Sequence, residues 1–316
     1  MRDEVDAGDE ASLFSLILRY DETPRVTSSS QTMSSPRPEM LSINTATVRK
    51  QWTLPDIISG CSRRGIRMIA PWRDQVAATG LDNVAQRLRD AGLSLSGYCR
   101  GGMFPAPDRA ARKRALDDNK RAIDEALELD SPCLVLVVGG LPKDDEGRIA
   151  SKDLAGAREM VRDGIGELLE YTRPVGMPLA IEPLHPMYAA DRACVNTVEH
   201  ANDLCDELGA GLGIAVDVYH VWWDPHLRRE IERAGGHAGR LLAFHICDWL
   251  VPTRDLLLDR GMMGDGVIDL PLIRSWMEAA GYRGAHEVEI FSANDWWLRD
   301  PDEVLATCIE RHQTRC

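Results

Sequence analysis

The chain has 316 residues, of which 44% are hydrophobic and 28% charged, and this ordinary globular composition leaves room for one large α/β barrel or two small domains. Its net charge of −13 speaks against nucleic acid as a partner, although a local basic groove is compatible with that balance. The eight cysteines form no CxxC pair and no apolar run reaches the ~20 residues of a membrane span, so we expect a cytoplasmic protein with reduced thiols and no membrane contact.

The first segment of the chain differs from the rest. Ser28–Pro38 reads SSSQTMSSPRP, a Ser/Thr/Pro-rich run with little apolar surface to bury. We therefore predict that residues 1–39 form a disordered N-terminal extension and that the folded domain covers residues 40–316. Met40 is also a candidate start codon.

From Met40 onward, apolar strand-like runs alternate with amphipathic helical stretches, which is the pattern of a parallel sheet. Eight strands are predicted, at Leu41–Asn44, Ile66–Pro71, Leu93–Tyr98, Cys133–Val138, Pro178–Glu182, Gly213–Asp217, Leu241–His245 and Glu287–Phe291. Helices are predicted at Ala110–Leu129, Asp153–Tyr171, Thr197–Leu208, Leu270–Ala280 and Asp302–His312. Eight strand–helix units in roughly 250 residues are typical of a (β/α)8 TIM barrel, and we predict that α/β fold as a single domain.

In the second half of the chain, four consecutive predicted strands each finish with a potential metal ligand. They are Glu182 in LAIEP, Asp217 in GIAVDVYH, His245 in LLAFHICD and Glu289 in HEVEIFS. A parallel barrel gathers the carboxyl ends of its strands on one face, so these residues are expected to converge. A single acidic residue after a strand is usually a solvated loop residue or a helix N-cap, but the recurrence on four strands favours a divalent metal site. Three carboxylates and one imidazole favour Mn²⁺ or Mg²⁺, and Zn²⁺ or Co²⁺ also accept such ligands.

Side chains alternate between the two faces of a strand, so the residues two positions before the four predicted ligands also face inward. These are Ala180, Ala215, Ala243 and Glu287, whereas the residues between, Ile181, Val216, Phe244 and Val288, are expected to pack outward against helices. We interpret Glu287 as a buried carboxylate one layer below the metal, where it hydrogen-bonds a ligand or water. The alternative is that the last strand is shifted by two residues and that Glu287 is the ligand.

Four further residues are predicted to bind substrate. His185, His220 and Asp248 each follow a predicted ligand by three residues, which places them at the rim of the barrel. A rim hydrogen bond with no role in chemistry is the alternative for each of them. Arg254 is a candidate to grip a substrate oxygen or carboxylate, and a surface ion pair with a loop Asp is equally compatible with its position.

The loop Asp259–Gly266, DRGMMGDG, is dense in glycine. It lacks the strand–GxGxxG–helix order of a dinucleotide fold and the Lys of a P-loop, so a tight loop that brings backbone close to the site is favoured over a phosphate cradle. Five tryptophans follow the last three predicted strands, and they either wall a sugar-sized pocket or pack beneath loops: Trp222, Trp223, Trp249, Trp296 and Trp297.

Glu at strand 5, DxxH at strand 6, HxxD at strand 7 and Glu at strand 8 resemble the xylose isomerase-like TIM barrel superfamily, over residues from about 40 to 312. This sugar phosphate isomerase/epimerase family also includes ketose 3-epimerases, an inosose dehydratase and endonuclease IV. The resemblance implies that Glu182, Asp217, His245 and Glu289 bind the metal and that His220 lies near the substrate. Leu184 replaces the strand 5 Lys of classical xylose isomerase, and Gly261 stands where endonuclease IV has a further His ligand.

We therefore expect a metal-dependent isomerase or epimerase of carbohydrate metabolism, acting on a sugar, sugar phosphate or related polyhydroxy carbonyl compound through an enediolate. The metal would chelate the carbonyl and an adjacent hydroxyl, while Glu182 and Glu289 would remove and return the proton. Two alternatives stay open: an inosose-type dehydratase, which expels a β-hydroxyl from the same enediolate, and a non-catalytic sugar-binding barrel. The expected partner is a small polyol or sugar, and a homo-oligomer is compatible with the sequence.

Overall fold

The computed structural model describes residues 35–316 with the exception of Ala238. Residues 1–34 of the predicted N-terminal extension therefore lie outside the described residues. The described chain begins with Ser35, and the buried Pro36 accepts a hydrogen bond on its carbonyl oxygen from the Gln313 side chain at 3.0 Å. A short 3-10 turn, η1 (Pro38–Met40), then leads into the first strand.

Strands and helices alternate along the described chain. The strands are β1 (Leu41–Asn44), β2 (Met68–Ala70), β3 (Ser94–Leu95), β4 (Tyr98–Gly102), β5 (Leu134–Val137), β6 (Leu179–Ile181), β7 (Leu212–Asp217), β8 (Leu241–Ile246), β9 (Asp248–Trp249), β10 (Arg260–Gly261) and β11 (His286–Val288). The α-helices are α2 (Leu54–Arg63), α3 (Arg73–Thr79), α4 (Leu81–Ala91), α5 (Arg109–Glu128), α6 (Leu154–Thr172), α7 (Val198–Leu208), α8 (Val218–Val221), α9 (Leu227–Gly235), α10 (Leu270–Ala279) and α11 (Pro301–Arg315). Shorter 3-10 turns are η2 (Thr45–Val48), η3 (Arg173–Val175), η4 (Pro186–Tyr188) and η5 (Trp296–Leu298).

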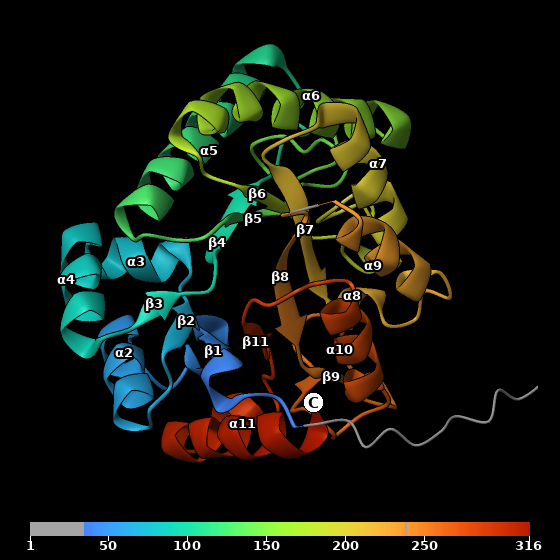
Figure 1. Cartoon of the computed structure of the whole chain (residues 1–316). Coiled ribbons are helices and arrows are strands. Elements are labelled where there is room, and N and C mark those ends of the chain that lie inside the picture. The colour runs from blue at the N-terminus through green and yellow to red at the C-terminus, as the bar shows by residue number, and fades with distance from the viewer. Residues whose placement is uncertain (1–34, 238) are drawn as a thin grey trace, which may run out of the picture. The chain divides into compact units, whose positions relative to one another are not determined.

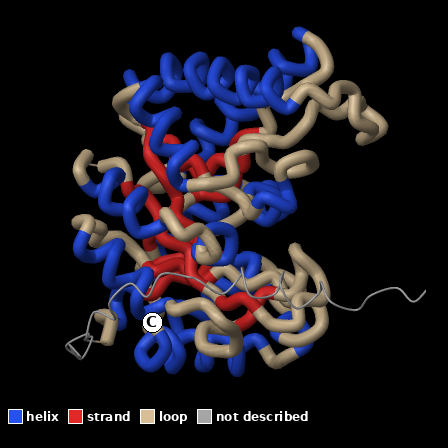
Figure 2. Tube along the Cα trace, turned by 90° about the vertical axis from the view of Figure 1, so that its right-hand side faces the viewer, coloured by secondary structure: helices blue, strands red, loops and turns tan. Residues whose placement is uncertain are grey.

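The main sheet is parallel and curls into a barrel. Its strand order is β3-β2-β1-β11-β8-β7-β6-β5-β4. A parallel bridge between Trp72 and Cys99, with a hydrogen bond from the Cys99 amide to the Pro71 carbonyl at 3.1 Å, links the two ends of that order. β3 and β4 are thus two parts of one barrel strand. Figures 1 and 2 show the strands at the centre with the helices around them, which confirms the predicted (β/α)8 barrel.

The predicted strands differ from the observed ones mainly at their ends. The third strand was expected to finish at Tyr98, but the barrel strand continues as β4 to Gly102. Two neighbouring residues of β5, Val135 and Leu136, pair with Cys99 and Gly101, so Arg100 is the extra residue of a β-bulge. Residues 99–102, with the sequence CRGG, contain a bulge and two glycines and show no alternation of apolar and polar residues. For this reason the sequence pattern did not predict this half of the strand.

Polar side chains at helix N-termini explain where the long helices begin. Asp108, Asp153, Thr197, Asp269 and Asp300 each accept a backbone hydrogen bond from the first turn of the helix that follows. Such caps satisfy N–H groups that have no partner inside the helix. The Asp300–Pro301 pair adds a proline at the first helical position of α11, where its missing N–H costs nothing.

The predicted alternation along the central strands is confirmed. Six mostly small residues fill the inside of the barrel, namely Cys99, Cys133, Val135, Ala180, Ala215 and Ala243. The larger residues between them, Ile181, Val216, Phe244 and Val288, belong to the core shared with the surrounding helices. Small residues leave space inside the barrel, and polar side chains occupy that space near the carboxyl ends of the strands.

All eight cysteines are buried and none forms a disulfide. Among the described residues, no helix is both long enough and apolar enough to cross a membrane.

Candidate active site

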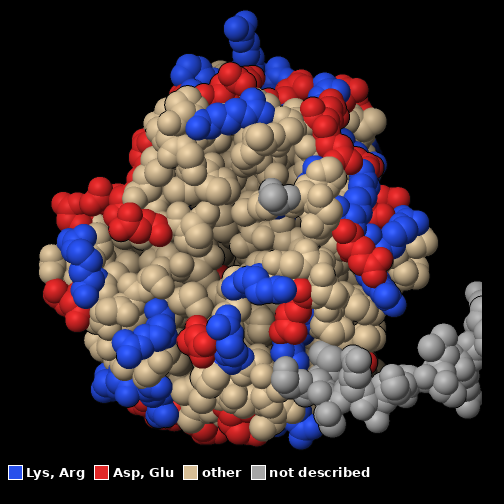
Figure 3. Space-filling view, viewed as in Figure 1, with Lys and Arg blue, Asp and Glu red and all other residues tan. Residues whose placement is uncertain are grey.

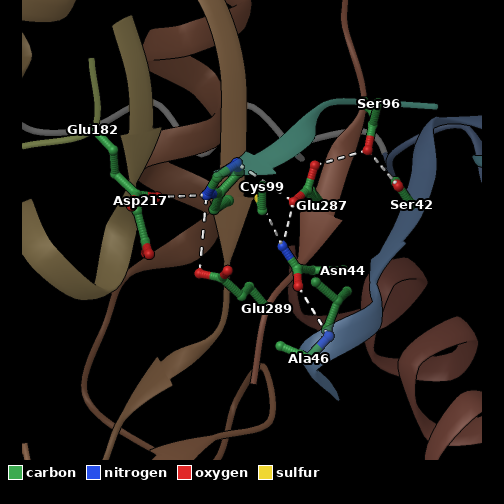
Figure 4. A network of polar contacts seen from close by, with 12 residues as sticks. Ser42, Asn44, Ala46, Ser96, Cys99, Glu182, Asp217, Glu287 and Glu289 are labelled. Carbon is green, nitrogen blue, oxygen red and sulfur yellow. Dashed lines mark hydrogen bonds and ion pairs between the residues drawn. The ribbon is translucent and has the colours of Figure 1, made fainter. Parts of the chain in front are cut away.

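Glu182, Asp217, His245 and Glu289 come together inside the barrel, as Figure 4 shows for the residues it labels. Each offers one potential ligand atom, and these four atoms lie within 4.8 Å of one another. All four residues are buried, with exposed fractions of 6% or less. They come from the ends of β6, β7, β8 and β11, four neighbouring strands of the sheet. The expected convergence is observed, and metal binding by this four-residue cluster remains a prediction.

The stagger of the strands decides which glutamate of β11 joins the cluster. Asp217 pairs in register with His245, and His245 in turn pairs with Glu287. Glu289 lies two residues further along the chain. Because strands in a barrel are displaced relative to their neighbours, the inward residue at the height of the cluster is Glu289, while Glu287 lies one layer below. The group of potential ligands accordingly contains Glu289 and not Glu287.

Glu287 is held in a polar layer beneath the cluster. Its Oε1 accepts a hydrogen bond from Asn44 Nδ2 at 2.8 Å, and its Oε2 accepts one from Ser96 Oγ at 2.7 Å. Its Oε1 also lies 3.5 Å from His245 Nε2. On the other side of the ring, His245 Nδ1 lies 2.8 Å from Glu182 Oε1. The imidazole therefore presents Nδ1 to the cluster and Nε2 to a carboxylate, which is how a metal-binding His is commonly oriented.

Burial and neighbouring charges partly oppose each other in setting the pKa values of three residues of the four-residue cluster. Burial opposes ionisation of Asp217, but Arg260, His220 and His245 together lower its pKa. Burial raises the pKa of Glu289 to about 8, Arg260 opposes that effect and Glu182 adds to it. Burial disfavours the charged form of His245, yet Glu287 and the hydrogen bond to Glu182 raise its pKa well above the ordinary value.

Arg260 is a functional candidate that the sequence patterns missed. It lies in β10 and is 3% exposed. Its Nη1 donates to Asp217 Oδ2 at 2.9 Å and to Glu289 Oε2 at 3.0 Å, and its guanidinium lies over the Tyr219 ring at 4.5 Å. The only local signal was a basic residue in the glycine-rich loop, and nothing in that pattern indicates burial against two carboxylates.

The donor set fits a divalent cation. Glu182, Asp217, Glu287 and Glu289 bring four buried carboxyl groups together, and among the described residues Arg260 is the permanent cation that hydrogen-bonds into this group. Buried carboxylates need compensating positive charge, and one guanidinium does not balance the set. Oxygen ligands with a single imidazole suit Mn²⁺, Mg²⁺ or Zn²⁺.

His220 borders the four-residue cluster through Arg260. Its Nε2 lies 3.1 Å from Arg260 Nη2, and because a guanidinium can only donate, Nε2 is the acceptor and Nδ1 carries the hydrogen. Nδ1 is buried and has no hydrogen-bond partner within the described chain. Burial lowers the pKa of His220 to about 3. The structure thus contains a neutral imidazole with an unused N–H donor beside the cluster.

His185 belongs to a group of aromatic rings near the rim. Its ring stacks on Trp249 with centroids 5.2 Å apart, and it makes an edge-to-face contact with Trp223, with centroids 5.8 Å apart. Trp249 also contacts Tyr219 at 4.7 Å and Trp222 at 5.9 Å. Trp222, Trp223 and Trp249 thus lie near one another, and the choice between a pocket wall and packing beneath loops stays open for them. Trp296 is buried, and Trp297 donates to the Ala46 carbonyl at 2.9 Å.

Asp248 and Arg254 make their contacts within the loop after β8. Asp248 accepts backbone hydrogen bonds from Trp249, Gly264 and Ile268 at 2.9 to 3.0 Å. Arg254 pairs with Asp259, with Nε 3.0 Å from Oδ2, which is the ion-pair alternative considered for it. A role for either residue toward substrate remains a prediction.

The glycine-rich loop brings two backbone segments close together. A Cβ at Gly266 would lie 2.1 Å from the Trp249 carbonyl oxygen, so only glycine fits there. The face seen in Figure 3 has a hollow near its centre, surrounded mostly by residues other than Lys, Arg, Asp and Glu.

Comparisons with known proteins agree with this architecture. The family model described as xylose isomerase-like TIM barrel matches residues 59–308. The crystal structure of protein SMc04130 from Sinorhizobium meliloti 1021 is 58% identical, with 89% of this chain and 99% of that chain covered and a TM-score of 0.85. A structure of the IolI protein with a binding zinc atom is 19% identical, covers 86% of this chain and 95% of that one, and has a TM-score of 0.72, a likeness of fold.

A curated relative comes from Halalkalibacterium halodurans. This inosose isomerase is 26% identical over 212 residues, which are 65% of this chain and 68% of the relative. Because the family model matches most of the barrel, the chain belongs to the xylose isomerase-like TIM barrel family.

Proposed function

We propose that the protein is a metal-dependent isomerase or epimerase that moves a proton on a carbon next to the carbonyl of a sugar-like polyhydroxy compound. The observation that carries this proposal is the buried cluster of three carboxylates and one imidazole, with ligand atoms within 4.8 Å of one another. Glu182, Asp217, His245 and Glu289 would hold a divalent cation. Such a cation supplies a Lewis acid beside the substrate carbonyl.

The two glutamates are the candidate proton carriers. Glu182 follows β6 and Glu289 follows β11, and these are the outer strands of the four that build the cluster. A substrate carbon between them would have one carboxylate on each side. One glutamate takes the proton from the carbon, which leaves an enediolate. The other glutamate, in its protonated form, delivers its own proton to the neighbouring carbon or to the opposite face, and exchange with solvent then resets both groups.

Two further side chains would position the substrate and the glutamates. Arg260 donates to both Asp217 and Glu289 and so restricts their orientation. The neutral His220 keeps an unused Nδ1–H, which suits a substrate hydroxyl as acceptor. The aromatic rings around His185 offer flat apolar surface to the C–H face of a sugar. The similarity to an inosose isomerase supports a keto-polyol as the substrate class.

Solvent deuterium tests the proposed proton transfer. Mn²⁺-loaded protein is incubated in D2O with a panel of ketoses and inososes, and mass spectrometry measures deuterium in the recovered substrate and product. We expect one deuterium at the reacting carbon. Glu182→Gln and Glu289→Gln should each slow incorporation by roughly 10²- to 10⁴-fold, measured at saturating metal. Glu170→Gln, with a side chain 78% exposed on α6, is the matched control and should behave as the wild type.

Three outcomes would contradict the proposal. Product formation without deuterium would indicate a hydride shift instead of proton transfer by the two glutamates. Wild-type protein that binds no divalent cation in equilibrium dialysis would remove its basis. Formation of an ultraviolet-absorbing enone product would instead favour the dehydratase.

A further inference from the structure

A cavity opens beside Cys99, over the barrel strands near β2 and β4. Its volume is about 440 Å³. Its charged and aromatic lining consists of Arg49, Trp72, Arg73, Asp74, Arg100 and Asp118. The cavity thus contains more basic than acidic side chains, although the whole chain carries a net charge of −13.

Two of the three arginines in this cavity have acidic partners. Arg49 forms an ion pair with Asp74. Arg73 donates from Nη1 to Asp118 and from Nε to Glu125, both at 2.8 Å. These guanidinium groups are neutralised by the protein itself.

Arg100 differs from both. It is half-buried, and no hydrogen bond or ion pair engages its side chain within residues 35–316. Burial lowers the pKa of Arg100, and the charge of Arg192 adds to that effect more than any other neighbouring group. Arg192 is also half-buried; its guanidinium lies 5.6 Å from the centre of the Tyr188 ring, and it has no acidic partner among the described residues. A half-buried guanidinium that no hydrogen bond or ion pair engages is unfavourable where water is partly excluded.

The local backbone holds Arg100 in this place. Arg100 is the extra residue of the β4 bulge, and a bulge turns one side chain away from the regular alternation of its strand. Asn119 braces the following residues, because its Oδ1 accepts from the Gly102 amide at 2.6 Å and its Nδ2 donates to the Gly102 carbonyl at 2.8 Å. A Cβ at Gly101 would lie 2.6 Å from the same Oδ1, so this arrangement depends on glycine.

The bulge also adjoins the candidate active site. The thiol of Cys99, the residue before Arg100, lies 3.6 Å from Asn44 Nδ2, and Asn44 donates to Glu287 beneath the four-residue cluster. Cys99 also packs in the same inner cluster as Ala180, two residues before Glu182. A substrate that reaches the four-residue cluster with one end can therefore extend toward Arg100 with the other.

We infer that Arg100, assisted by Arg192, is the binding site for an oxyanion on the substrate, so that the substrate class is an anionic polyol, either a sugar acid or a sugar phosphate. This inference rests on the proposed function for the reacting end of the substrate, but the oxyanion site has contacts of its own. A guanidinium binds the planar pair of oxygens of a carboxylate or phosphate through two parallel hydrogen bonds. The neutral aromatic rings around His185 offer no such charge.

Isothermal titration of three ligands with one carbon skeleton tests the inference. Mn²⁺-loaded protein is titrated with ribitol, ribonate and ribitol 5-phosphate. We expect at least one of the two anions to bind roughly 10- to 100-fold more tightly than ribitol, the range expected for charged hydrogen bonds. Preference for ribonate identifies a carboxylate site, and preference for ribitol 5-phosphate a phosphate site.

Variants separate Arg100 from the overall charge of the protein. Arg100→Gln should abolish the preference for the anion while leaving the affinity for ribitol within about threefold, and Arg192→Gln should reduce it less. Arg228→Gln removes the same charge from an exposed ion pair with Glu232 on α9 and should keep the full preference. Equal loss in Arg100→Gln and Arg228→Gln, or no preference in the wild type, overturns the inference.

A metal-free arm keeps this test independent of the proposed function. The same proteins are titrated with inorganic phosphate after removal of divalent cations with EDTA. Weak phosphate binding that is lost in Arg100→Gln supports the oxyanion site even if the protein binds no metal. Metal binding and deuterium exchange that persist while phosphate binds equally to wild type and Arg100→Gln overturn the oxyanion site alone.

Discussion

Arg260 is buried against two carboxylates of the four-residue cluster, and its role depends on whether a cation is bound there. With no metal, its guanidinium is the charge that Asp217 and Glu289 contact. A divalent cation at the cluster would also compensate the charges of these two carboxylates. Removing one partner of a buried ion pair leaves the other uncompensated, and this is costly even where the intact pair contributes little.

Replacement of Arg260 therefore predicts a metal-dependent change in stability. Arg260→Met should lower the free energy of unfolding by about 3–5 kcal/mol in EDTA and by clearly less in saturating Mn²⁺, because the cation compensates the carboxylates. Urea unfolding under the two conditions measures this difference. Arg260→Lys keeps the charge but not the planar fork and should fall between wild type and Arg260→Met. Equal losses with and without Mn²⁺ would contradict the expectation.

At the scale of the element, the loop between β8 and α10 is organised by one carboxylate. Asp248 accepts from the amides of Trp249, Gly264 and Ile268 and is 1% exposed. The same loop delivers Arg260 to the cluster. Residues far apart in the loop are thus hydrogen-bonded to Asp248, just after the end of β8. We expect the position of Arg260 to depend on these hydrogen bonds.

Asp248→Ala should loosen this loop without unfolding the barrel. Loss of the shared acceptor leaves three amides unpaired, at about 1–3 kcal/mol for a buried group. Amide exchange followed by mass spectrometry should become faster by roughly 10- to 100-fold in peptides covering residues 261–269. Asp255→Ala removes an exposed acceptor for Leu257 and Leu258 in the same loop and should affect only its own peptide. Unchanged exchange at 261–269 in Asp248→Ala would show that packing alone holds the loop.

At the scale of the whole molecule, β11 is the last strand of the barrel and pairs with β1, and the C-terminal helix α11 contacts β11 through a histidine pair. His286 Nδ1 lies 3.0 Å from His312 Nε2. Gln313 Nε2 donates to His312 Nδ1 at 3.2 Å, so His312 carries its hydrogen on Nε2 and donates to His286. Burial is the main reason why the pKa of His286 is lowered to about 3 and that of His312 to about 4. The charge of Arg274 contributes to both shifts, and His312 also contributes to that of His286.

This pair predicts loss of stability in mild acid. Both imidazoles are neutral in the folded protein and titrate near 6.5 once unfolded, so the unfolded state binds more protons below that value. Stability is fully present above about pH 6.5 and is lost as pH falls toward 4, by at most about 1.4 kcal/mol per pH unit for each histidine. Urea unfolding between pH 7.5 and 5 measures the slope.

Substitution at one member of the pair isolates its contribution. His312→Gln keeps a hydrogen-bond donor but does not titrate, and it should flatten the pH dependence. His226→Gln, at an exposed position, should leave it unchanged. A pH profile that is the same in His312→Gln and wild type would assign the acid sensitivity to other groups.

Local sequence patterns determined most of the fold and the main candidate site. The alternation of Ile181, Val216 and Phe244 with small inward residues depends only on the two-residue period of a strand. Carboxylates and an imidazole at strand ends were visible for the same reason, because parallel strands share one edge. Glu287 could be placed below Glu289 by counting two residues back.

Tertiary structure alone decided which other charges reach that site. The burial of Arg260 depends on how a long loop folds back over the barrel. The position of Arg100 depends on a bulge, and no acidic side chain of residues 35–316 pairs with it across the cavity. Arg254 and Asp248 are charged residues of the same loop as Arg260, yet Arg254 pairs with Asp259 and Asp248 accepts hydrogen bonds from loop amides. A charge is set by its residue type, but its partners are set by segments distant in sequence, so no local pattern could have distinguished these four residues.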